Sequence, residues 1–369
     1  RQCPLRSEPP MPVHITKTFL PPLEDYQAMI SRIFDDVWLT NHGPLVGRLE
    51  KELAALFGVR HCLAVTNGTT GLQIALRALK IGGEVITTPF SYVATTSSIV
   101  WEGATPVMAD IDPETLNISP LAIERAVTSR SSAILATHIY GNACDIEGIA
   151  KVAAAHGLAV IYDAAHAFGS RYRGKSIFTY GDVAATSLHA TKLFHTVEGG
   201  ALFTERQDLA ETMARMRNFG HIGQEAFAEA GINGKMSELH AAMGLCLLPY
   251  IETIMSRRRE ASGIYDKYLE GLPLQRQRIN PGCDYNHSYY PVIFESEKQL
   301  LTAISALNAA EIYPRRYFYP SLSNLSYVCG QKTPLAESIS VRVLCLPLYH
   351  DISADIIEQI CGLIKKAIA

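Results

Sequence analysis

The chain has little charge of one sign, no long apolar run and no closely spaced cysteine pair. Its 33 Lys and Arg residues against 36 Asp and Glu give a net charge of −3, which offers no basic surface for nucleic acid. The eight cysteines are scattered without a Cys-x-x-Cys pair, a pattern typical of reduced thiols rather than of disulfides or a zinc site. No apolar stretch reaches membrane-spanning length, and residues 1–10 lack the apolar core of a signal peptide. We therefore expect a cytoplasmic protein without nucleic acid, membrane or metal partners.

Two common nucleotide-binding loops are also missing. The corner Thr66-Asn67-Gly68-Thr69-Thr70-Gly71 has neither the Gly-Lys end of a Walker loop nor a Gly-x-Gly-x-x-Gly fingerprint, so a nicotinamide cofactor is not expected. The corner joins a predicted strand to a helix start, where free backbone N–H groups and the helix dipole favour an anion. A simple capped turn is the alternative interpretation.

The periodicity of apolar residues predicts strands that alternate with helices. At 369 residues the chain is long enough for two modest domains. We expect strands at 61–66, 84–88, 106–110, 133–139 and 158–162, and helices at 44–57, 69–80, 91–101, 121–127 and 146–156. This alternation predicts an α/β fold with a mostly parallel sheet and helices on both faces. Ligands of such sheets bind beyond the carboxyl ends of the strands.

The pattern changes after residue 181. Short strands at 183–188 and 200–204 precede a helix at 209–217 and a long helical region at 237–271, which Pro249 breaks. A smaller α+β unit follows, with strands at 288–294 and 341–346 and helices at 297–310 and 354–368. We therefore predict an N-terminal extension at 1–15, unstructured over 1–10, a large domain at 16–248 and a small domain at 249–369.

A lysine and an aspartate are the residues that point to a chemistry. Asp163 ends the apolar run 158–162, and Lys192 follows 29 residues later in a loop bounded by glycines. A lysine amine forms Schiff bases, and a carboxylate at a strand end can hold a pyridinium nitrogen. A pyridoxal phosphate (PLP) enzyme needs both groups from its protein. Taken alone, Lys192 could be a surface charge and Asp163 a helix cap.

Other polar and aromatic residues follow the predicted strands. Tyr92 comes after one strand, where its ring could stack on a flat cofactor or fill the core. His166 and His189 could be core or capping histidines. If the strands are parallel, these residues meet Asp163, Ser187 and Lys192 at one crevice, beside the 66–71 corner.

Five motifs in fixed order resemble a known family. They are Asn-Gly-Thr-Thr at 67–70, Pro-Phe-Ser-Tyr-Val-Ala-Thr at 89–95, Asp-Ala-Ala-His at 163–166, Ser-Leu-His-Ala-Thr-Lys at 187–192 and Glu-Gly-Gly at 198–200. The set resembles the DegT/DnrJ/StrS group, which are PLP-dependent nucleotide-sugar aminotransferases of fold type I. The resemblance extends over nearly the whole chain from about Thr16. It implies that the large domain binds PLP, which becomes pyridoxamine phosphate (PMP) in the half-reaction.

The resemblance also implies individual roles. Lys192 would be the Schiff-base lysine and proton shuttle, Asp163 would bind the pyridine nitrogen, and Tyr92 would stack on the ring. His166 would contact the side of the ring that carries the hydroxyl, where many members have glutamine. The phosphate would be held by Thr69, Thr70 and Ser187.

The segment 231–244 resembles a family segment whose asparagine reaches the cofactor phosphate of the neighbouring subunit. Asn233 would do so here, which implies a homodimer with shared active sites; a local helix cap is the alternative for Asn233. Some relatives replace the lysine by histidine and are dehydratases. Because Lys192 is retained, transamination is expected.

The segments 19–24 and 38–45 most resemble enzymes that act at C4 of dTDP-4-keto-6-deoxyglucose. The resemblance implies that L-glutamate is the amino donor and dTDP-4-amino-4,6-dideoxyglucose the product, in deoxysugar biosynthesis for O-antigen or another glycan. A C3 aminotransferase on dTDP-3-keto-6-deoxyhexose stays open, as does a PLP-binding regulator without turnover. Expected substrate contacts, which could equally be surface residues, are Asn41, His42, His189, Arg316, Tyr317 and Tyr319.

Overall fold

A seven-stranded sheet organises the larger part of the chain. The computed structural model describes residues 12–328 and 331–368, so the segment 1–10, predicted to be unstructured, lies outside the described residues. The strands run across the sheet in the order β2 (His61–Val65), β10 (Gly200–Thr204), β9 (Val183–Ser187), β6 (Ala159–Asp163), β5 (Ser131–Thr137), β3 (Glu84–Thr87) and β4 (Thr105–Met108). All but β10 point the same way, which confirms the predicted α/β fold with a mostly parallel sheet.

The antiparallel strand β10 matters for the position of the site. Gly200 pairs with Val65 of β2 and with Ser187 of β9, so β10 begins at the edge where both neighbours end. An added Cβ at Gly200 would lie 2.5 Å from the Asn67 carbonyl carbon, so this close approach requires a glycine. The strand therefore closes the sheet edge beside the 66–71 corner.

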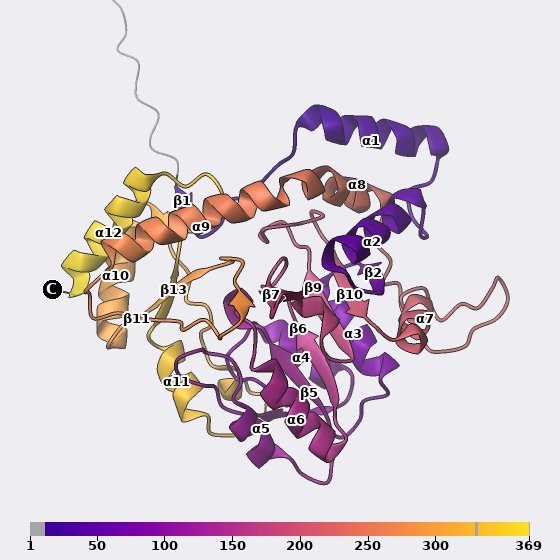
Figure 1. The fold of residues 1–369 in the computed structure, drawn as a ribbon, viewed down its shortest axis with the longest axis horizontal. Coiled ribbons are helices and arrows are strands. Elements are labelled where there is room, and N and C mark those ends of the chain that lie inside the picture. Colours follow the sequence, from indigo (N-terminus) through magenta and orange to yellow (C-terminus); the bar gives the residue numbers. More distant parts are fainter. Residues whose placement is uncertain (1–11, 329–330, 369) are drawn as a thin grey trace, which may run out of the picture.

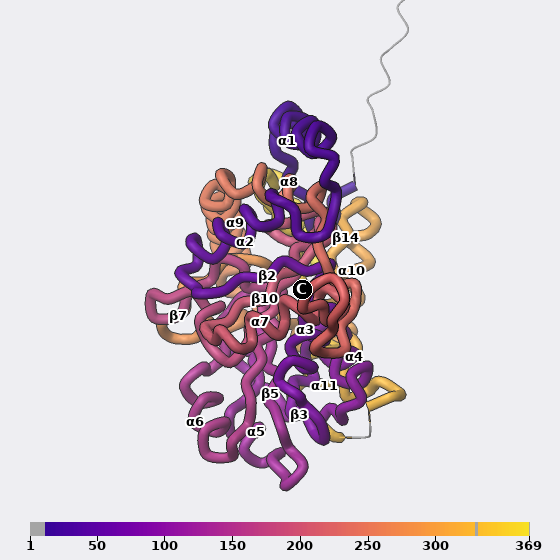
Figure 2. The backbone as a smooth tube through the Cα atoms, turned by 90° about the vertical axis from the view of Figure 1, so that its right-hand side faces the viewer, coloured from indigo at the N-terminus to yellow at the C-terminus, as the bar shows by residue number. Residues whose placement is uncertain are grey.

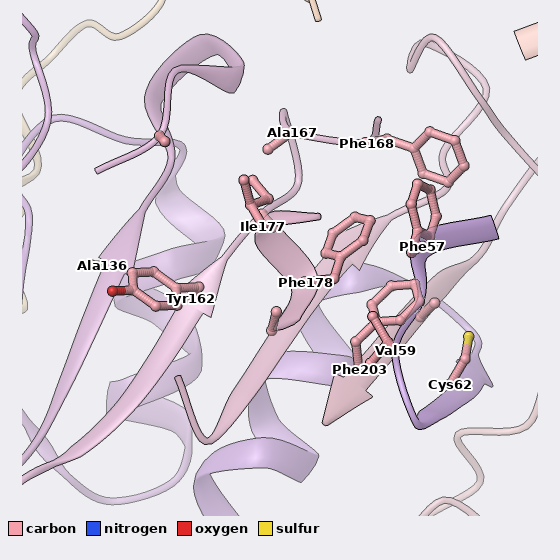
Figure 3. Packing of buried hydrophobic residues seen from close by; sticks show 14 of the residues in the cluster. Phe57, Val59, Cys62, Ala136, Tyr162, Ala167, Phe168, Ile177, Phe178 and Phe203 are labelled. Carbon is pink, nitrogen blue, oxygen red and sulfur yellow. The ribbon is translucent and has the colours of Figure 1, made fainter. Parts of the chain in front are cut away.

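Helices cover both faces of the sheet (Figure 1). The helices α2 (Pro44–Phe57), α5 (Pro120–Ala126), α6 (Ile146–His156) and α8 (Glu238–Leu247) share one apolar core, and α3 (Gly68–Ala78), α4 (Val93–Trp101) and α7 (Gln207–Met216) share another. Figure 3 shows the aromatic part of the first core, where Phe178 stacks on Phe203 with ring centres 4.2 Å apart and Phe57 packs edge-on against both. Burial of such rings holds the sheet rigid beneath the site.

A further apolar core lies in the C-terminal part of the chain. The sheet β11 (Gln275–Arg276), β13 (Tyr290–Ile293) and β15 (Val343–Leu346) packs with α9 (Ile251–Tyr268), α10 (Glu297–Ala309) and α12 (Ala354–Ile368). The strand β1 (Val13–His14) pairs with β14 (Ile312–Tyr313), so residues 13–14 belong to this part of the fold and not to an extension. The remaining short elements are η1 (Ile139–Gly141), β7 (Arg171–Tyr172), β8 (Lys175–Ser176), η2 (Ile177–Thr179), β12 (Cys283–Asp284), η4 (Leu322–Asn324) and α11 (Pro334–Ser340).

The long helical region is interrupted where Pro249 predicts a break. The short helix η3 (Leu248–Tyr250) separates α8 from α9, which leads diagonally to the C-terminal part in Figure 1. Counted as one helix, Glu238–Tyr268 is long and apolar enough to cross a membrane, although the sequence showed no such stretch. Charged residues are scattered along this stretch, and half of its most apolar part is buried, as is usual for core helices.

The sequence does not predict α1 (Leu23–Asp36). This helix lies along α8 (Figures 1 and 2), and the Tyr26 hydroxyl donates to the Leu239 carbonyl at 3.1 Å. Pro22 precedes it without a capping side chain, and Leu23 and Phe34 are 64% and 68% exposed. Its apolar residues do have helical spacing, so the pattern itself is compatible with a helix, although only Ile33 is buried within the chain.

Candidate active site

A cavity of about 450 Å³ opens at the carboxyl edge of the sheet. It lies where β2, β3, β6 and β9 end, which is the place predicted for ligands of this fold. Eight of the predicted site residues line it, namely Thr69, Tyr92, Asp163, His166, Ser187, His189, Lys192 and Tyr317. The large sheet and the segment around Tyr317 thus bring together side chains that are more than 200 residues apart in sequence, such as Thr69 and Tyr317.

One end of the cavity is the corner between β2 and α3. The Asn67 side chain caps α3 by accepting the Thr70 N–H at 2.8 Å, and Gly68 and Thr69 line the cavity. The first N–H groups of a helix have no intrahelical partner, so this end favours an anion. An added Cβ at Gly68 would lie 3.2 Å from the Ser187 Cβ, which shows how closely the corner meets the end of β9. Thr70 is not in the cavity lining, because the cap holds it behind the corner.

Asp163 forms part of the cavity wall at the end of β6. It is 6% exposed, its Oδ2 accepts from the Thr95 hydroxyl at 2.7 Å, and its Oδ1 accepts from the Ala165 N–H at 3.1 Å. Burial raises the pKa of Asp163, and the two donors oppose that rise. The two hydrogen bonds fix the Asp163 carboxylate at the cavity wall, where it can pair with a cationic group of a ligand.

Thr95, which the sequence does not single out, reaches Asp163 because α4 begins later than predicted. The helix starts at Val93 and not at residue 91, since Tyr92 has extended backbone dihedrals. The Ser91 and Thr95 hydroxyls then pair at 2.8 Å, and Tyr92, 57% exposed, lies at the cavity.

Lys192 lies in the loop between β9 and β10. Backbone hydrogen bonds from Leu188 to Gly199 at 2.8 Å and from Ala190 to Val197 at 2.7 Å brace that loop. Burial lowers the pKa of the Lys192 amine, and the carboxylate of Asp163 opposes this effect. A lowered pKa increases the neutral fraction of the amine, which is the form that attacks carbonyls and accepts protons.

His166 and His189 lie in different environments. His166 is 5% exposed and stacks on Phe318 with ring centres 5.4 Å apart, and its Nδ1 has no partner among the described residues. Burial lowers the pKa of His166, so the imidazole is neutral. His189 pairs through Nδ1 with the Thr191 hydroxyl at 2.8 Å, and its Nε2 lies 3.5 Å from Glu198.

The segment 315–319 contributes different residues from those predicted. Arg315 and Tyr317 line the cavity, whereas Arg316 and Tyr319 are not in its lining. Arg316 donates to Glu297 at 2.7 Å and to the Val341 carbonyl at 3.0 Å, and its guanidinium stacks on the Tyr319 ring. Side chains alternate along extended chain, so one of two adjacent arginines must point away.

Asn41, His42 and Asn233 do not reach this cavity within one chain. His42 lines a separate cavity of about 240 Å³ with Arg217 and Lys235, and Asn41 and Asn233 are exposed. The Asn233 Oδ1 accepts from Lys235 Nζ at 2.7 Å, whereas the cap of α8 is Ser237. The alternative of a helix cap at Asn233 is therefore wrong for α8.

Lys192 and the buried carboxylate of Asp163 line one cavity at the carboxyl edge of a mostly parallel sheet, and a PLP enzyme needs these two groups from its protein. A family model, the DegT/DnrJ/EryC1/StrS aminotransferase family, matches residues 23–365. The chain belongs to this family, and it is an aminotransferase.

Similar proteins cover nearly its full length. A dTDP-4-amino-4,6-dideoxy-D-glucose transaminase from Shigella dysenteriae is 40% identical, with 96% of this chain and 99% of the relative covered. A transaminase of the same description from Escherichia coli is 37% identical, with 95% and 98% covered. The solved structure of DesI in the presence of its TDP-sugar product superimposes with a TM-score of 0.92 at 34% identity, with 96% and 92% covered.

Proposed function

We propose that this chain uses PLP to transfer the amino group of L-glutamate to dTDP-4-keto-6-deoxy-D-glucose, forming dTDP-4-amino-4,6-dideoxy-D-glucose. The observation that carries the proposal is the convergence of Lys192, Asp163 and the anion-favouring corner at Gly68 on one cavity. The descriptions of the Shigella and Escherichia relatives support the sugar and the position of the amine.

The cavity fits PLP in size and in the chemistry of its walls. Its volume of about 450 Å³ lies in the usual range of small-molecule sites. Gly68, Thr69 and Ser187 would hold the phosphate, and Asp163 would pair with the ring nitrogen. The Nδ1 of His166, which has no partner within residues 12–328 and 331–368, is a buried polar group beside the same cavity and suits a polar ring substituent.

The proposed chemistry assigns distinct tasks to the chain. When bound, PLP supplies an electron-withdrawing ring that stabilises negative charge on a carbon that loses its proton. Asp163 keeps a proton on the ring nitrogen, because its buried carboxylate gains from a cationic neighbour. The Lys192 amine takes the proton from the amino donor and returns one to the sugar carbon. Arg315 places positive charge at the cavity for anionic substrates.

We also propose that the active unit is a homodimer in the cytoplasm, with each site shared between two chains. The exposed Asn233 and the cavity lined by His42 and Lys235 lie apart from the cavity of their own chain. Their position supports a contribution to the site of a second copy. The division at residues 248 and 249 into a PLP-binding domain and a small domain is part of the same proposal.

Turnover with and without Lys192 tests the proposed function. The purified chain should absorb as a PLP enzyme, lose that absorbance with L-glutamate and regain it with the keto sugar. Lys192→Ala should abolish both changes, whereas Lys175→Ala, at an exposed position of β8, should leave them intact. Persistent amino transfer by the Lys192 variant would sink the assignment. Bound PLP without turnover on any keto sugar would favour the regulator instead.

A further inference from the structure

Tyr289 brings a phenol hydroxyl to the amine of Lys192. The Lys192 Nζ donates to the Tyr289 hydroxyl over 3.5 Å and lies 5.9 Å from the centre of its ring. Tyr289 directly precedes β13 in the C-terminal part, whereas Lys192 follows β9 of the large sheet. The reacting amine is therefore contacted by a residue from a different part of the chain.

The segment that carries Tyr289 is tied to the wall of the cavity. Asn286 is fully buried, and its side-chain amide donates to the carbonyls of His166 at 2.8 Å and Phe168 at 2.9 Å. The Ser288 hydroxyl donates to the same His166 carbonyl at 2.5 Å. An added Cβ at Gly141 would collide with Asn286, so the fit leaves no spare room.

A buried arginine also holds the segment. Arg258 of α9 is 5% exposed and donates to the carbonyls of His287 at 2.9 Å and Ser288 at 2.5 Å. The Tyr285 hydroxyl donates to the Tyr289 carbonyl at 2.7 Å. The backbone that leads up to Tyr289 is thus fixed, which is the support that a precisely placed hydroxyl requires.

We propose that Tyr289 is a catalytic residue that steadies the Lys192 amine by accepting a hydrogen bond from its protonated form. This inference rests on the proposed function, in which Lys192 carries the proton. The amine becomes an ammonium when it takes the proton from the amino donor. The ammonium donates to the Tyr289 oxygen until the proton returns to substrate, and the phenol keeps its own proton throughout.

The protonation states agree with these tasks. Burial raises the pKa of Tyr289, so the phenol is neutral over the working pH range. Burial lowers the pKa of Lys192, which favours release of the proton. A neutral acceptor stabilises the ammonium without a negative charge that would trap its proton.

Tyr289→Phe tests the proposal because it removes only the hydroxyl. The ring packs edge-on against His166 at 5.1 Å and Tyr317 at 5.7 Å, and phenylalanine keeps both contacts. In the PLP-loaded chain, the half-reaction with L-glutamate should slow by about 10-fold or more, with KM for L-glutamate changed by less than about twofold. Tyr265→Phe, which loses a 2.8 Å bond to the Pro347 carbonyl in the C-terminal core, should leave both values unchanged.

A second measurement reports on the amine without turnover. In the full chain loaded with PMP, acetylation of Lys192 by acetic anhydride is followed across pH by peptide mass spectrometry. Loss of the acceptor destabilises the ammonium, so Tyr289→Phe should lower the pKa of Lys192 by about one pH unit. Ser288→Ala removes a hydrogen bond that holds the segment of Tyr289, so it should slow the half-reaction of the native chain. When it is added to the Tyr289→Phe variant, it should have little further effect.

Each outcome decides the proposal. A folded Tyr289→Phe chain with the native half-reaction rate and acetylation profile would overturn it. A Tyr289→Phe chain with a slower half-reaction and a lower pKa of Lys192 would support the proposal. Because the half-reaction needs no sugar, failure on every keto sugar would count against the proposed function while leaving the Tyr289 result readable.

Discussion

Asp163→Asn should have opposite effects on catalysis and on the stability of the cofactor-free chain. Asparagine keeps the size of the side chain and one acceptor oxygen for Thr95 or Ala165, but it removes the charge. Leaving a buried cation without its partner costs about 3–5 kcal/mol. If the transition state loses that much, the half-reaction with L-glutamate slows by roughly 10²- to 10⁴-fold.

The stability of the cofactor-free chain should rise in Asp163→Asn, because the pKa of Asp163 is raised in the folded state. Burial raises the pKa of Asp163 in the folded chain, so the folded state holds the charged form less favourably than the unfolded state. Stability from this group is present below the unfolded pKa and is lost as pH rises through the folded pKa. At neutral pH the charge therefore destabilises the cofactor-free chain, and Asp163→Asn should raise its Tm.

Absorbance of the half-reaction and thermal unfolding of the cofactor-free chain measure the two effects. Asp182→Asn is the matched control, since Asp182 lies at the opposite end of β9, where it accepts the Val160 N–H at 2.9 Å and pairs with Arg206 at 3.0 Å. It should lower the Tm and leave the half-reaction rate unchanged. An Asp163→Asn chain that keeps more than a tenth of the native rate, or that has a lower cofactor-free Tm, would refute the reasoning.

Two further predictions concern the phosphate end and the second copy. Gly68→Ala places a Cβ 3.2 Å from the Ser187 Cβ, so PLP should bind roughly 10-fold more weakly by fluorescence titration, whereas Gly47→Ala, with nothing within 4 Å, should not change affinity. Asn233→Ala and Lys192→Ala should each be inactive alone, but mixed subunits should regain about a quarter of the sites. No recovery in verified mixed dimers would contradict a shared site.

Much of the sheet and the polar wall of the site follow from the sequence. Alternating apolar runs locate the strands, and parallel order places Asp163, Ser187 and Lys192 at the same edge. The motif at 67–70 also predicts the cap, because Asn67 precedes a helix start. These features depend on local pattern and on a topology that the pattern implies.

The remainder depends on three-dimensional register. Arg315, and not Arg316, faces the cavity because the backbone of Arg315 pairs with that of Cys345, which is distant in sequence. Thr95 reaches Asp163 only because α4 begins at Val93. The position of Tyr289 beside Lys192 could not be predicted from the sequence, because the strand pattern at 288–294 predicts core side chains and not a hydroxyl near a lysine.

The most direct test of the central claim is the position of the amine in the product. The PLP-loaded chain is incubated with L-glutamate and dTDP-4-keto-6-deoxy-D-glucose, and the sugar nucleotide is analysed by NMR. We predict a single product with nitrogen on C4 of the 6-deoxyhexose and one equivalent of 2-oxoglutarate. An unchanged keto sugar, or amination at C3 when dTDP-3-keto-6-deoxyhexose is supplied instead, would contradict the account.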